Sequence, residues 1–265
     1  MNQAFQTLVI TQRGAGVAQI NMSRPQVFNA FDEVMIAELD AAFEQLSQDD
    51  NVRVIVLAGE GKHFSAGADL QWMQRASEAR LDWNLDDARR FAGMLCRIAT
   101  CPKPTVARVQ GAALGGGVGL TCACDMAVAA DNASFAVSEA KFGILPSIIG
   151  PYVVNAVGKR NARYLALTTS RIDAATALSM GMVQRVVPLV DVDTEVDRVA
   201  HDLVIGGPSA QIEIKKLMDQ LSVAPVSPEV RELTASTIAR VRGSDEAREG
   251  FAAFLAKRPA KWIPE

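Results

Sequence analysis

The sequence predicts an α/β protein, because strand-like and helix-like segments alternate along its first half. Two strand-like segments, at residues 52–59 and 104–111, are continuous apolar runs of the kind that helices cover on both faces. Turns that could close a hairpin are missing between the later strands, which indicates a mostly parallel sheet. The chain has 265 residues, 49% of them hydrophobic, which suffices for one large globular domain.

The first quarter of the chain predicts two strands followed by one helix. Segments 5–12 and 16–23 flank a Gly-Ala-Gly turn and are expected to form a hairpin or two neighbouring strands. Asp32 is a suitable N-cap for a helix whose apolar face is formed by Met35, Leu39, Ala42, Phe43 and Leu46. The polar stretch at residues 47–51 ends this helix, and the first continuous apolar strand follows it.

A second unit repeats this order. A loop at residues 60–69 leads to a helix predicted over residues 82–100, with an apolar side formed by Phe91, Met94, Leu95 and Ile98. A Cys-Pro-Lys-Pro stretch breaks this helix before the next apolar strand. A short helical segment and a third strand, at residues 125–130, come after it.

Helical patterns dominate the remainder of the chain, apart from one strand-like segment at residues 183–189. Residues 227–241 have helical spacing, and residues 243–259 open with a Ser-Asp cap and close at a proline. We therefore predict a core domain over residues 1–200 and a C-terminal helical oligomerisation region over residues 201–265. The second region is too small for a large core of its own, so its apolar face is expected to dock on the main domain or on another subunit.

The charge pattern and the N-terminal segment argue against several classes of protein. The 27 Lys and Arg residues and 30 Asp and Glu residues give a formal net charge of −3, without a block of like charge, so nucleic-acid binding is not expected. No apolar stretch reaches the roughly 18 residues of a membrane span, and the N-terminus lacks the layout of a signal peptide. We expect a cytoplasmic protein without a membrane partner.

Histidine and cysteine are too scarce for the usual nucleophile and metal sites. The two histidines are His63, beside a loop of small residues, and His201, which lies in a helical pattern and is expected at the surface. The cysteines have neither the number nor the spacing of a disulfide framework or a zinc site, and buried, reduced thiols are expected at Cys96, Cys101, Cys122 and Cys124. No metal is predicted.

Two loops that follow apolar strands carry small residues, at positions 63–69 and 111–119. Small side chains let backbone N–H groups approach a ligand oxygen, and two such groups facing one another form an oxyanion hole. The same glycines could instead serve only tight turns or close helix packing. Dinucleotide binding is disfavoured, because Leu120 stands where a G-x-G-x-x-G motif beginning at Gly115 needs glycine, and no Walker A loop is present.

An ordered set of motifs resembles the crotonase (enoyl-CoA hydratase/isomerase) superfamily over nearly the whole chain. The motifs are Arg24-Pro25, Asn29-Ala30-Phe31, FSAGADL, GAALGGGVGL, CDMAVAADNASFAVSEAKFGILP, GMVQRVVP and a terminal FLAKRP. The resemblance implies a crotonase-type spiral of ββα units with a C-terminal helical trimerisation region, assembled as a homotrimer or a dimer of trimers. It also implies an acyl-CoA thioester substrate; coenzyme A is then part of the substrate, and no separate cofactor is expected.

The resemblance further implies roles for individual residues. The backbone N–H groups of Ala68 and Gly116 would hold the thioester carbonyl oxygen, because an enolate that forms there needs two preorganised donors. Residues expected along the coenzyme A arm are Val27, Ala66, Asp69 and Leu70. Phe254 and Lys257 would reach the nucleotide end of coenzyme A, from a neighbouring subunit, although Lys257 could equally be a solvated surface residue.

Glu139 is the expected acid–base residue. Hydratases of this family are expected to carry two glutamates, at the positions of Gly119 and Glu139, and here only the second is present. Glu139 lies in an apolar run, where desolvation would raise its pKa and help it to exchange a proton with the α-carbon of the substrate. The alternative role is a structural carboxylate that pairs with the nearby Lys141.

A single carboxylate leaves the type of reaction open. Moving a double bond requires one proton shuttle, so Glu139 alone fits an isomerase. The stretches ADLQWMQRA and SEAKFGILPSIIGPYVV, and the glycine at 119, look closer to hydratases of methylglutaconyl-CoA and isohexenylglutaconyl-CoA, which belong to leucine and acyclic terpene catabolism. We therefore expect a hydratase; the alternatives are an isomerase and a catalytically inactive CoA-binding shell.

A branched glutaconyl substrate would need a partner for its distal carboxylate. Arg75, Arg89 and Arg90 lie in segments expected to cover the acyl pocket, although each could be a solvated surface residue. Aromatic residues that could shape this pocket, or serve only packing, are Trp72, Trp83 and Tyr152. His63 is expected to give packing or polar support rather than catalysis.

Overall fold

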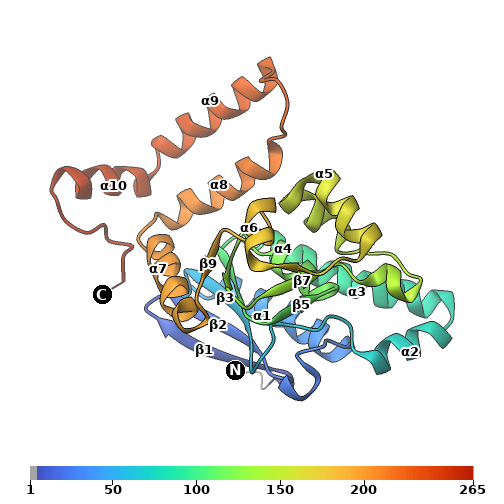
Figure 1. The fold of residues 1–265 in the computed structure, drawn as a ribbon. Coiled ribbons are helices and arrows are strands. Elements are labelled where there is room, and N and C mark those ends of the chain that lie inside the picture. The colour runs from blue at the N-terminus through green and yellow to red at the C-terminus, as the bar shows by residue number, and fades with distance from the viewer. Residues whose placement is uncertain (1–4, 265) are drawn as a thin grey trace.

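The computed structural model describes residues 5–264 and confirms the predicted α/β architecture (Figure 1). The main sheet has the strand order β1-β2-β3-β4-β6-β9, with bounds Leu8–Gly14, Val17–Met22, Val54–Gly59, Thr105–Val109, Met126–Ala130 and Arg185–Val187. β1 and β2 form the predicted antiparallel hairpin, and every later pair of neighbours is parallel. Crossover connections therefore place helices against both faces of this sheet.

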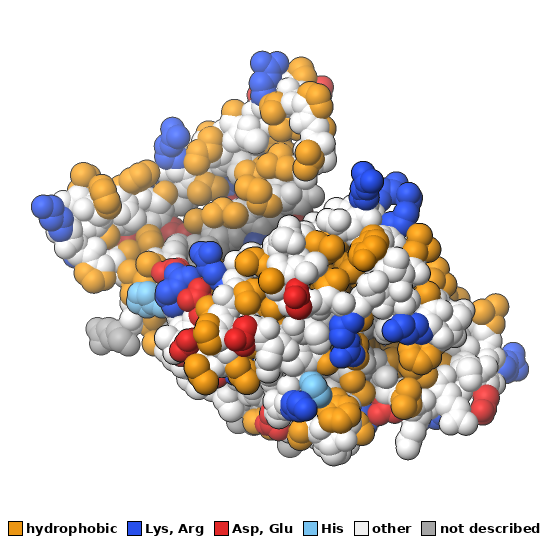
Figure 2. Space-filling view, in the orientation of Figure 1, with side chains coloured by type: hydrophobic (Ala, Val, Ile, Leu, Met, Phe, Trp, Pro, Cys, Tyr) orange, Lys and Arg blue, Asp and Glu red, His pale blue; other side chains and the backbone are white. Residues whose placement is uncertain are grey.

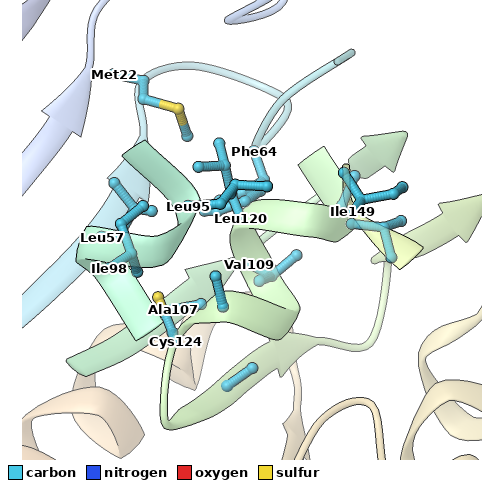
Figure 3. Close-up of a cluster of buried hydrophobic side chains, with 14 of the residues drawn as sticks. Met22, Leu57, Phe64, Leu95, Ile98, Ala107, Val109, Leu120, Cys124 and Ile149 are labelled. Atoms are coloured by element: carbon cyan, nitrogen blue, oxygen red, sulfur yellow. The ribbon is translucent and has the colours of Figure 1, made fainter. Parts of the chain in front are cut away.

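Both faces of β3 are buried, as its continuous apolar sequence predicted. Ile55 and Leu57 belong to the larger core, together with residues of α1 (Glu33–Gln48) and α3 (Leu81–Ala99). The alternate residues of the strand, Val54 and Val56, pack in a second cluster against α7 (Val192–Val204). Figure 3 shows part of the larger core, where Leu57, Leu95 and Ile98 lie among other apolar side chains.

The first helix begins where the sequence predicted. The side chain of Asp32 accepts hydrogen bonds from the N–H groups of Val34 and Met35, which caps α1. The helix α2 (Leu70–Glu78) was not predicted: the sequence indicated a loop at residues 60–69 and a helix from residue 82, with no element between them. The residue in the sequence that could have indicated the start of α2 is Asp69. Its side chain caps the helix by accepting hydrogen bonds from the N–H groups of Gln71 and Trp72.

A second, three-stranded sheet was also not predicted as a separate unit. It consists of β5 (Ala112–Leu114), β7 (Ser134–Ala136) and β8 (Ile172–Asp173), in that order. These strands are too short for a period-two pattern to stand out from their surroundings. The sheet matters because β5 leads directly into α4 (Gly116–Ala123), the helix that begins in the second glycine loop.

The C-terminal helices form an arm that extends away from the body of the molecule (Figure 1). They follow α5 (Gly150–Thr168), α6 (Ala174–Met180) and α7; the arm itself is α8 (Pro208–Gln220), α9 (Pro228–Arg242) and α10 (Asp245–Leu255). Ser244 caps α10, as the sequence predicted, and Ser227 caps α9, which was predicted from its helical spacing alone. The predicted boundary at residue 200 falls inside α7, and the division into two regions remains a prediction.

Apolar side chains gather along this arm (Figure 2). A salt bridge of 2.7 Å between Lys215 of α8 and Asp125 ties the arm to the body.

Within residues 5–264, none of the helices has both the length and the apolar character that crossing a membrane requires.

The cysteines and His201 lie where the sequence predicted, with one exception. Cys101 and Cys124 are buried and Cys122 is partly buried, but Cys96 is exposed, so its predicted burial was wrong. Cys96 lies on the outer side of α3, where a helical position next to core residues faces solvent. All four thiols are free, and His201 is exposed on α7.

Candidate active site

The two loops of small residues lie side by side. The Ser65 N–H donates a hydrogen bond to the Ala112 carbonyl at 3.1 Å, and the Leu114 N–H donates one to the Ser65 carbonyl at 3.0 Å. This short parallel pairing joins the ends of two segments that follow neighbouring strands of the main sheet, β3 and β4. The loops therefore meet at the carboxyl edge of that sheet.

Glycine is required where these loops make contact. Gly67 has a φ of +87°, and a Cβ atom there would lie 2.5 Å from the Leu114 carbonyl oxygen. A Cβ atom at Gly116 would overlap the Phe31 ring. Close packing is thus one role of these glycines, and it is the role that brings the two backbones together.

The N–H groups of Ala68 and Gly116 donate no hydrogen bond to any residue between 5 and 264. Their neighbours do donate: the Asp69 N–H to the Phe31 carbonyl at 2.9 Å, and the Gly115 N–H to the Ala136 carbonyl at 2.8 Å. Gly116 is the first residue of α4, where an N–H group has no acceptor within the helix. Both Ala68 and Gly116 line one cavity of about 410 Å³, so both donors are available to a ligand.

Glu139 lines the same cavity, at the start of the short helix η2 (Glu139–Phe142). Its Oε2 atom is buried and has no hydrogen-bond partner in the described part of the chain. Its Oε1 atom lies against Gly115, since a Cβ atom on that glycine would be 3.2 Å away. The carboxylate is therefore next to the start of α4.

Burial raises the pKa of Glu139 above its ordinary value, because desolvation penalises the charged form; hydrogen bonds from the backbone of Glu139 and Ser138 oppose this effect. Across residues 5–264, no ion pair joins Glu139 to Lys141, so the alternative structural role has no support. A carboxylate with a raised pKa and a free oxygen is suited to transfer protons.

The rest of the cavity is mainly apolar. Its deep wall consists of buried side chains: Phe31, Trp72, Phe91 and Ile149. Three of them form an aromatic cluster, with ring centroids 6.1 Å apart for Phe31 and Trp72 and 5.1 Å apart for Phe31 and Phe91. Its outer rim carries exposed apolar side chains at Phe142, Ile144 and Leu145. This lining suits an apolar ligand whose polar end lies near Glu139.

The three arginines considered for a distal carboxylate do not line this cavity. Arg75 forms a salt bridge of 2.7 Å with Glu33, Arg89 one of 2.9 Å with Asp86, and Arg90 one of 3.2 Å with Asp87. No lysine or arginine is present in the described lining. Arg75 has its acidic partner on another element, whereas Arg89 and Arg90 pair with aspartates three positions earlier in α3, a spacing that the sequence does show.

Among the three aromatic candidates, only Trp72 lines the cavity; Trp83 and Tyr152 are partly buried against the core. Sequence reasoning also missed Phe31, Phe91 and Ile149 as lining residues. Phe91 was identified as apolar and inward-facing, but periodicity does not distinguish a side chain that faces the core from one that faces a cavity.

None of the four residues expected along the coenzyme A arm is in the described lining of the cavity. Val27 ends the short helix η1 (Pro25–Val27). The Ala66 N–H donates a hydrogen bond of 2.9 Å to the carbonyl of Phe28, the residue after Val27. Leu70 is 73% exposed. The Asp69 side chain is already engaged as the α2 cap and in a 3.0 Å salt bridge with Arg24.

Phe254 and Lys257 lie on the C-terminal arm, far along the chain from this cavity (Figure 1). Phe254 is 81% exposed and lines a different cavity, of about 550 Å³, between the helices of the arm. Lys257 is also exposed, just after α10. Neither residue lines the cavity that contains Glu139, so a second subunit would have to bring them there.

Polar residues of the N-terminal motifs support the site from outside. The Arg24 guanidinium donates to the Ala30 carbonyl and pairs with Asp69, and the buried Asn29 amide donates to the His63 carbonyl at 2.8 Å. His63 Nδ1 accepts a hydrogen bond of 3.0 Å from the Ala112 N–H. Burial and the nearby cations Lys62 and Arg171 lower the pKa of His63, which keeps the ring neutral for this acceptor role. His63 thus gives polar support, as predicted.

Comparisons with known proteins agree with this geometry. Residues 12–264 match the family described as enoyl-CoA hydratase/isomerase. A probable enoyl-CoA hydratase of Rhizobium meliloti is 35% identical over 263 residues, which cover 98% of each chain.

Solved structures extend the agreement to the fold. An enoyl-CoA hydratase from Shewanella pealeana has a TM-score of 0.93 at 37% identity, over 97% of this chain and 96% of its own. Pseudomonas aeruginosa AtuE has a TM-score of 0.91 at 34% identity, over 98% of this chain and all of its own. These similarities confirm the predicted crotonase-type α/β fold, and the chain belongs to the enoyl-CoA hydratase/isomerase family.

Proposed function

We propose that this protein is an enoyl-CoA hydratase that binds the thioester carbonyl with the backbone N–H groups of Ala68 and Gly116 and transfers protons with Glu139. One observation carries the proposal: the buried Oε2 atom of Glu139 lacks a partner within the described chain, and it lies in the cavity that contains both free donors. Relatives named enoyl-CoA hydratase support it.

The reaction follows from these groups. Two N–H donors stabilise the negative charge that develops on the thioester oxygen, and loss of one such donor typically costs about 3 kcal/mol of barrier. Glu139 takes a proton from water as the water oxygen bonds to C3 of the substrate. The same carboxyl group then returns a proton to C2, so that water is added across the double bond with its atoms balanced.

We propose an apolar acyl chain for the substrate, because the deep wall of the cavity is apolar and its described lining carries no cation. The resemblance to hydratases of branched glutaconyl thioesters gives a second, finer candidate, 3-methylglutaconyl-CoA or a longer isoprenoid homologue. In that candidate, one of Arg75, Arg89 and Arg90 would have to leave its present acidic partner and turn towards the cavity, or several hydrogen-bond donors would have to hold the distal carboxylate instead.

An isomerase is the alternative chemistry, since one carboxylate can also move a proton between C2 and C4. Ultraviolet absorbance separates the reactions: hydration removes the absorbance of a conjugated 2-enoyl thioester, and isomerisation of a 3-enoyl thioester creates it. We expect loss of absorbance with crotonyl-CoA or a longer 2-enoyl-CoA. Binding of these thioesters without either change would contradict the proposal and support an inactive CoA-binding shell.

The assembly and the location belong to the same proposal. We propose a cytoplasmic homotrimer or dimer of trimers, in which the exposed Phe254 and Lys257 of one copy reach coenzyme A bound to its neighbour. The apolar side chains exposed along the arm support this assembly, because one chain leaves them in water.

A further inference from the structure

We propose that Ile149 determines the acyl-chain specificity of this site by closing the deep end of the cavity, and that Gly119 is present because Ile149 occupies the space beside it. This inference rests on the proposed function, since it assigns the deep end of the cavity to the acyl chain.

The contact between these two residues leaves no room for a side chain at position 119. Gly119 lies inside α4, and a Cβ atom on it would overlap the Cγ2 methyl of Ile149 and lie 3.0 Å from the Ile149 Cβ. Leu95 Cδ1 would be 3.6 Å away on another side. Glycine is unfavourable inside a helix, so a specific contact is needed to explain it. The contact with Ile149 supplies that explanation.

Ile149 is the buried end of a segment that lines the cavity. The segment starts with the exposed Ile144 and Leu145 at the rim and ends at Ile149, which is only 2% exposed and precedes α5. Figure 3 shows Ile149 at the edge of the core cluster that contains Leu95 and Leu120. The side chain therefore faces the cavity on one side and the core around α4 on the other.

Ile149 is positioned to limit the length of the acyl chain that the cavity can hold. A thioester carbonyl bound at Ala68 and Gly116 directs its acyl group towards the buried wall, since the opposite side is the open rim. Truncation of Ile149 would extend the cavity towards Gly119, which has no side chain to fill the new space. Each additional buried CH₂ of a ligand favours binding by about fourfold.

The test uses saturated thioesters, which bind but do not react. The dissociation constants of butyryl-CoA and octanoyl-CoA are measured by calorimetry for the wild-type protein and for Ile149→Ala, and the ratio of 2-octenoyl-CoA to crotonyl-CoA hydration is measured alongside. We expect both ratios to shift towards the longer chain by about 15-fold, the gain from two buried CH₂ groups. Ile149→Val, a milder change, should give a smaller shift in the same direction.

Val157→Ala is the matched control, because Val157 is buried on α5 but does not line this cavity. It should lower stability and leave the chain-length ratios unchanged. An unchanged binding ratio in both Ile149 variants overturns the inference. If the wild-type protein hydrates no enoyl thioester but Ile149→Ala still shifts the binding ratio, hydration is excluded, and only the assignment of the deep end of the cavity to the acyl chain is retained.

A second experiment tests the contact between Gly119 and Ile149. Gly119→Ala should lower the midpoint of unfolding, because the new methyl group overlaps Ile149. Adding Ile149→Ala removes the overlapping methyl and should restore part of that loss. Additive effects of the two substitutions would show that the residues are not coupled and would overturn this part of the inference.

Discussion

The buried carboxylate of Glu139 is expected to lower the stability of the fold. Its Oε2 atom is buried without a hydrogen-bond partner in residues 5–264, and burial raises its pKa. Since the folded protein holds this proton more tightly than the unfolded chain, ionisation of Glu139 destabilises the fold. The cost is absent below the ordinary glutamate pKa of 4.5 and grows as the pH rises through the raised value.

Glu139→Gln is therefore expected to abolish activity and to stabilise the protein. Turnover should fall by at least about 10²-fold, because the proton shuttle is lost. The free energy of unfolding at pH 7 should increase, and the increase should shrink towards pH 4.5 and below. Activity assays and denaturant unfolding at several pH values measure both effects. Retained hydration in this variant would exclude Glu139 as the acid–base residue; Lys141→Gln is the control and should change neither quantity.

Gly67 is expected to control the geometry of the two backbone donors. Gly67→Ala places a methyl group 2.5 Å from the Leu114 carbonyl oxygen, at a φ of +87°, and so pushes the two loops apart. We expect kcat to fall by about 10²-fold or more, as when one oxyanion donor is lost. Gly93→Ala is the control: Gly93 has open space around it in α3, so alanine should stabilise the protein by about 0.5–1 kcal/mol. Equal activity of the two variants would contradict this role.

At the scale of elements, a buried hydrogen bond joins α2 to α3. Trp72 Nε1 donates to the Oδ2 atom of Asp87 at 3.0 Å, and both side chains are buried. Trp72 also lines the cavity, so this bond fixes the position of a cavity wall. The helix α2, which the sequence did not predict, is therefore part of the cavity wall.

Asp87→Ala should loosen this wall. The variant leaves the indole N–H without its acceptor, which costs about 1–3 kcal/mol of stability. We expect a higher KM for enoyl thioesters as well, because Trp72 is no longer held. Denaturant unfolding and steady-state kinetics measure both changes. Asp86→Ala, on the exposed face of α3, is the control and should lose no more than about 1 kcal/mol. An unchanged KM in Asp87→Ala would limit this bond to a structural role.

A second connection between elements holds α7 on the sheet. Asp193, in the first turn of α7, forms salt bridges of 2.7 Å with Arg108 of β4 and 2.9 Å with Arg13 of β1. Hydrogen bonds from Arg108, assisted by Arg13, lower the pKa of Asp193 to about 2. The stabilisation from this lowered pKa is complete above the ordinary value of 3.8 and is lost as the pH falls through about 2.

Asp193→Asn is expected to cost about 1 kcal/mol of stability at pH 7, since the carboxylate is half exposed and solvent screens its charge. The difference from the wild-type protein should stay constant down to about pH 5 and shrink below the ordinary pKa of aspartate. Denaturant unfolding between pH 3 and 7 measures it. A difference that grows in acid would contradict this assignment. The neighbouring, exposed Asp191→Asn serves as the control.

At the scale of the whole molecule, the arm of α8, α9 and α10 leaves large apolar side chains exposed. They include Phe251, Phe254 and Leu255 on α10 and Ile214 and Met218 on α8. Large apolar side chains that gather on a protein surface often mark a site of interaction with another protein. Association of several copies would cover this surface and would also supply the residues of the arm to a neighbouring site.

The assembly is expected to be a trimer or hexamer of the 28.4 kDa chain, which light scattering measures directly. Lys257→Ala should raise the KM for enoyl thioesters several-fold and leave kcat unchanged, because the residue would contact coenzyme A rather than the reacting atoms. Lys261→Ala is the control, since Lys261 faces Glu249. A monomer in solution, or an unchanged KM for Lys257→Ala, would contradict this expectation.

Local periodicity and caps such as Asp32 and Ser244 predicted the α/β fold, the strands of the main sheet and most of the long helices. The two glycine loops stand out because small residues follow apolar strands, whereas Glu139 was predicted from the resemblance to the family, as the match to its second glutamate.

The contacts between these elements became known only from the tertiary structure. Three arginines that looked available are paired with acidic side chains, Gly119 is explained by a contact with Ile149, and Trp72 joins the wall through Asp87. Apart from the Arg89 and Arg90 pairs, which lie one turn apart on α3, these contacts join residues of different elements. Spacing along the sequence reports which face of one element a residue occupies, but not what the facing element places there.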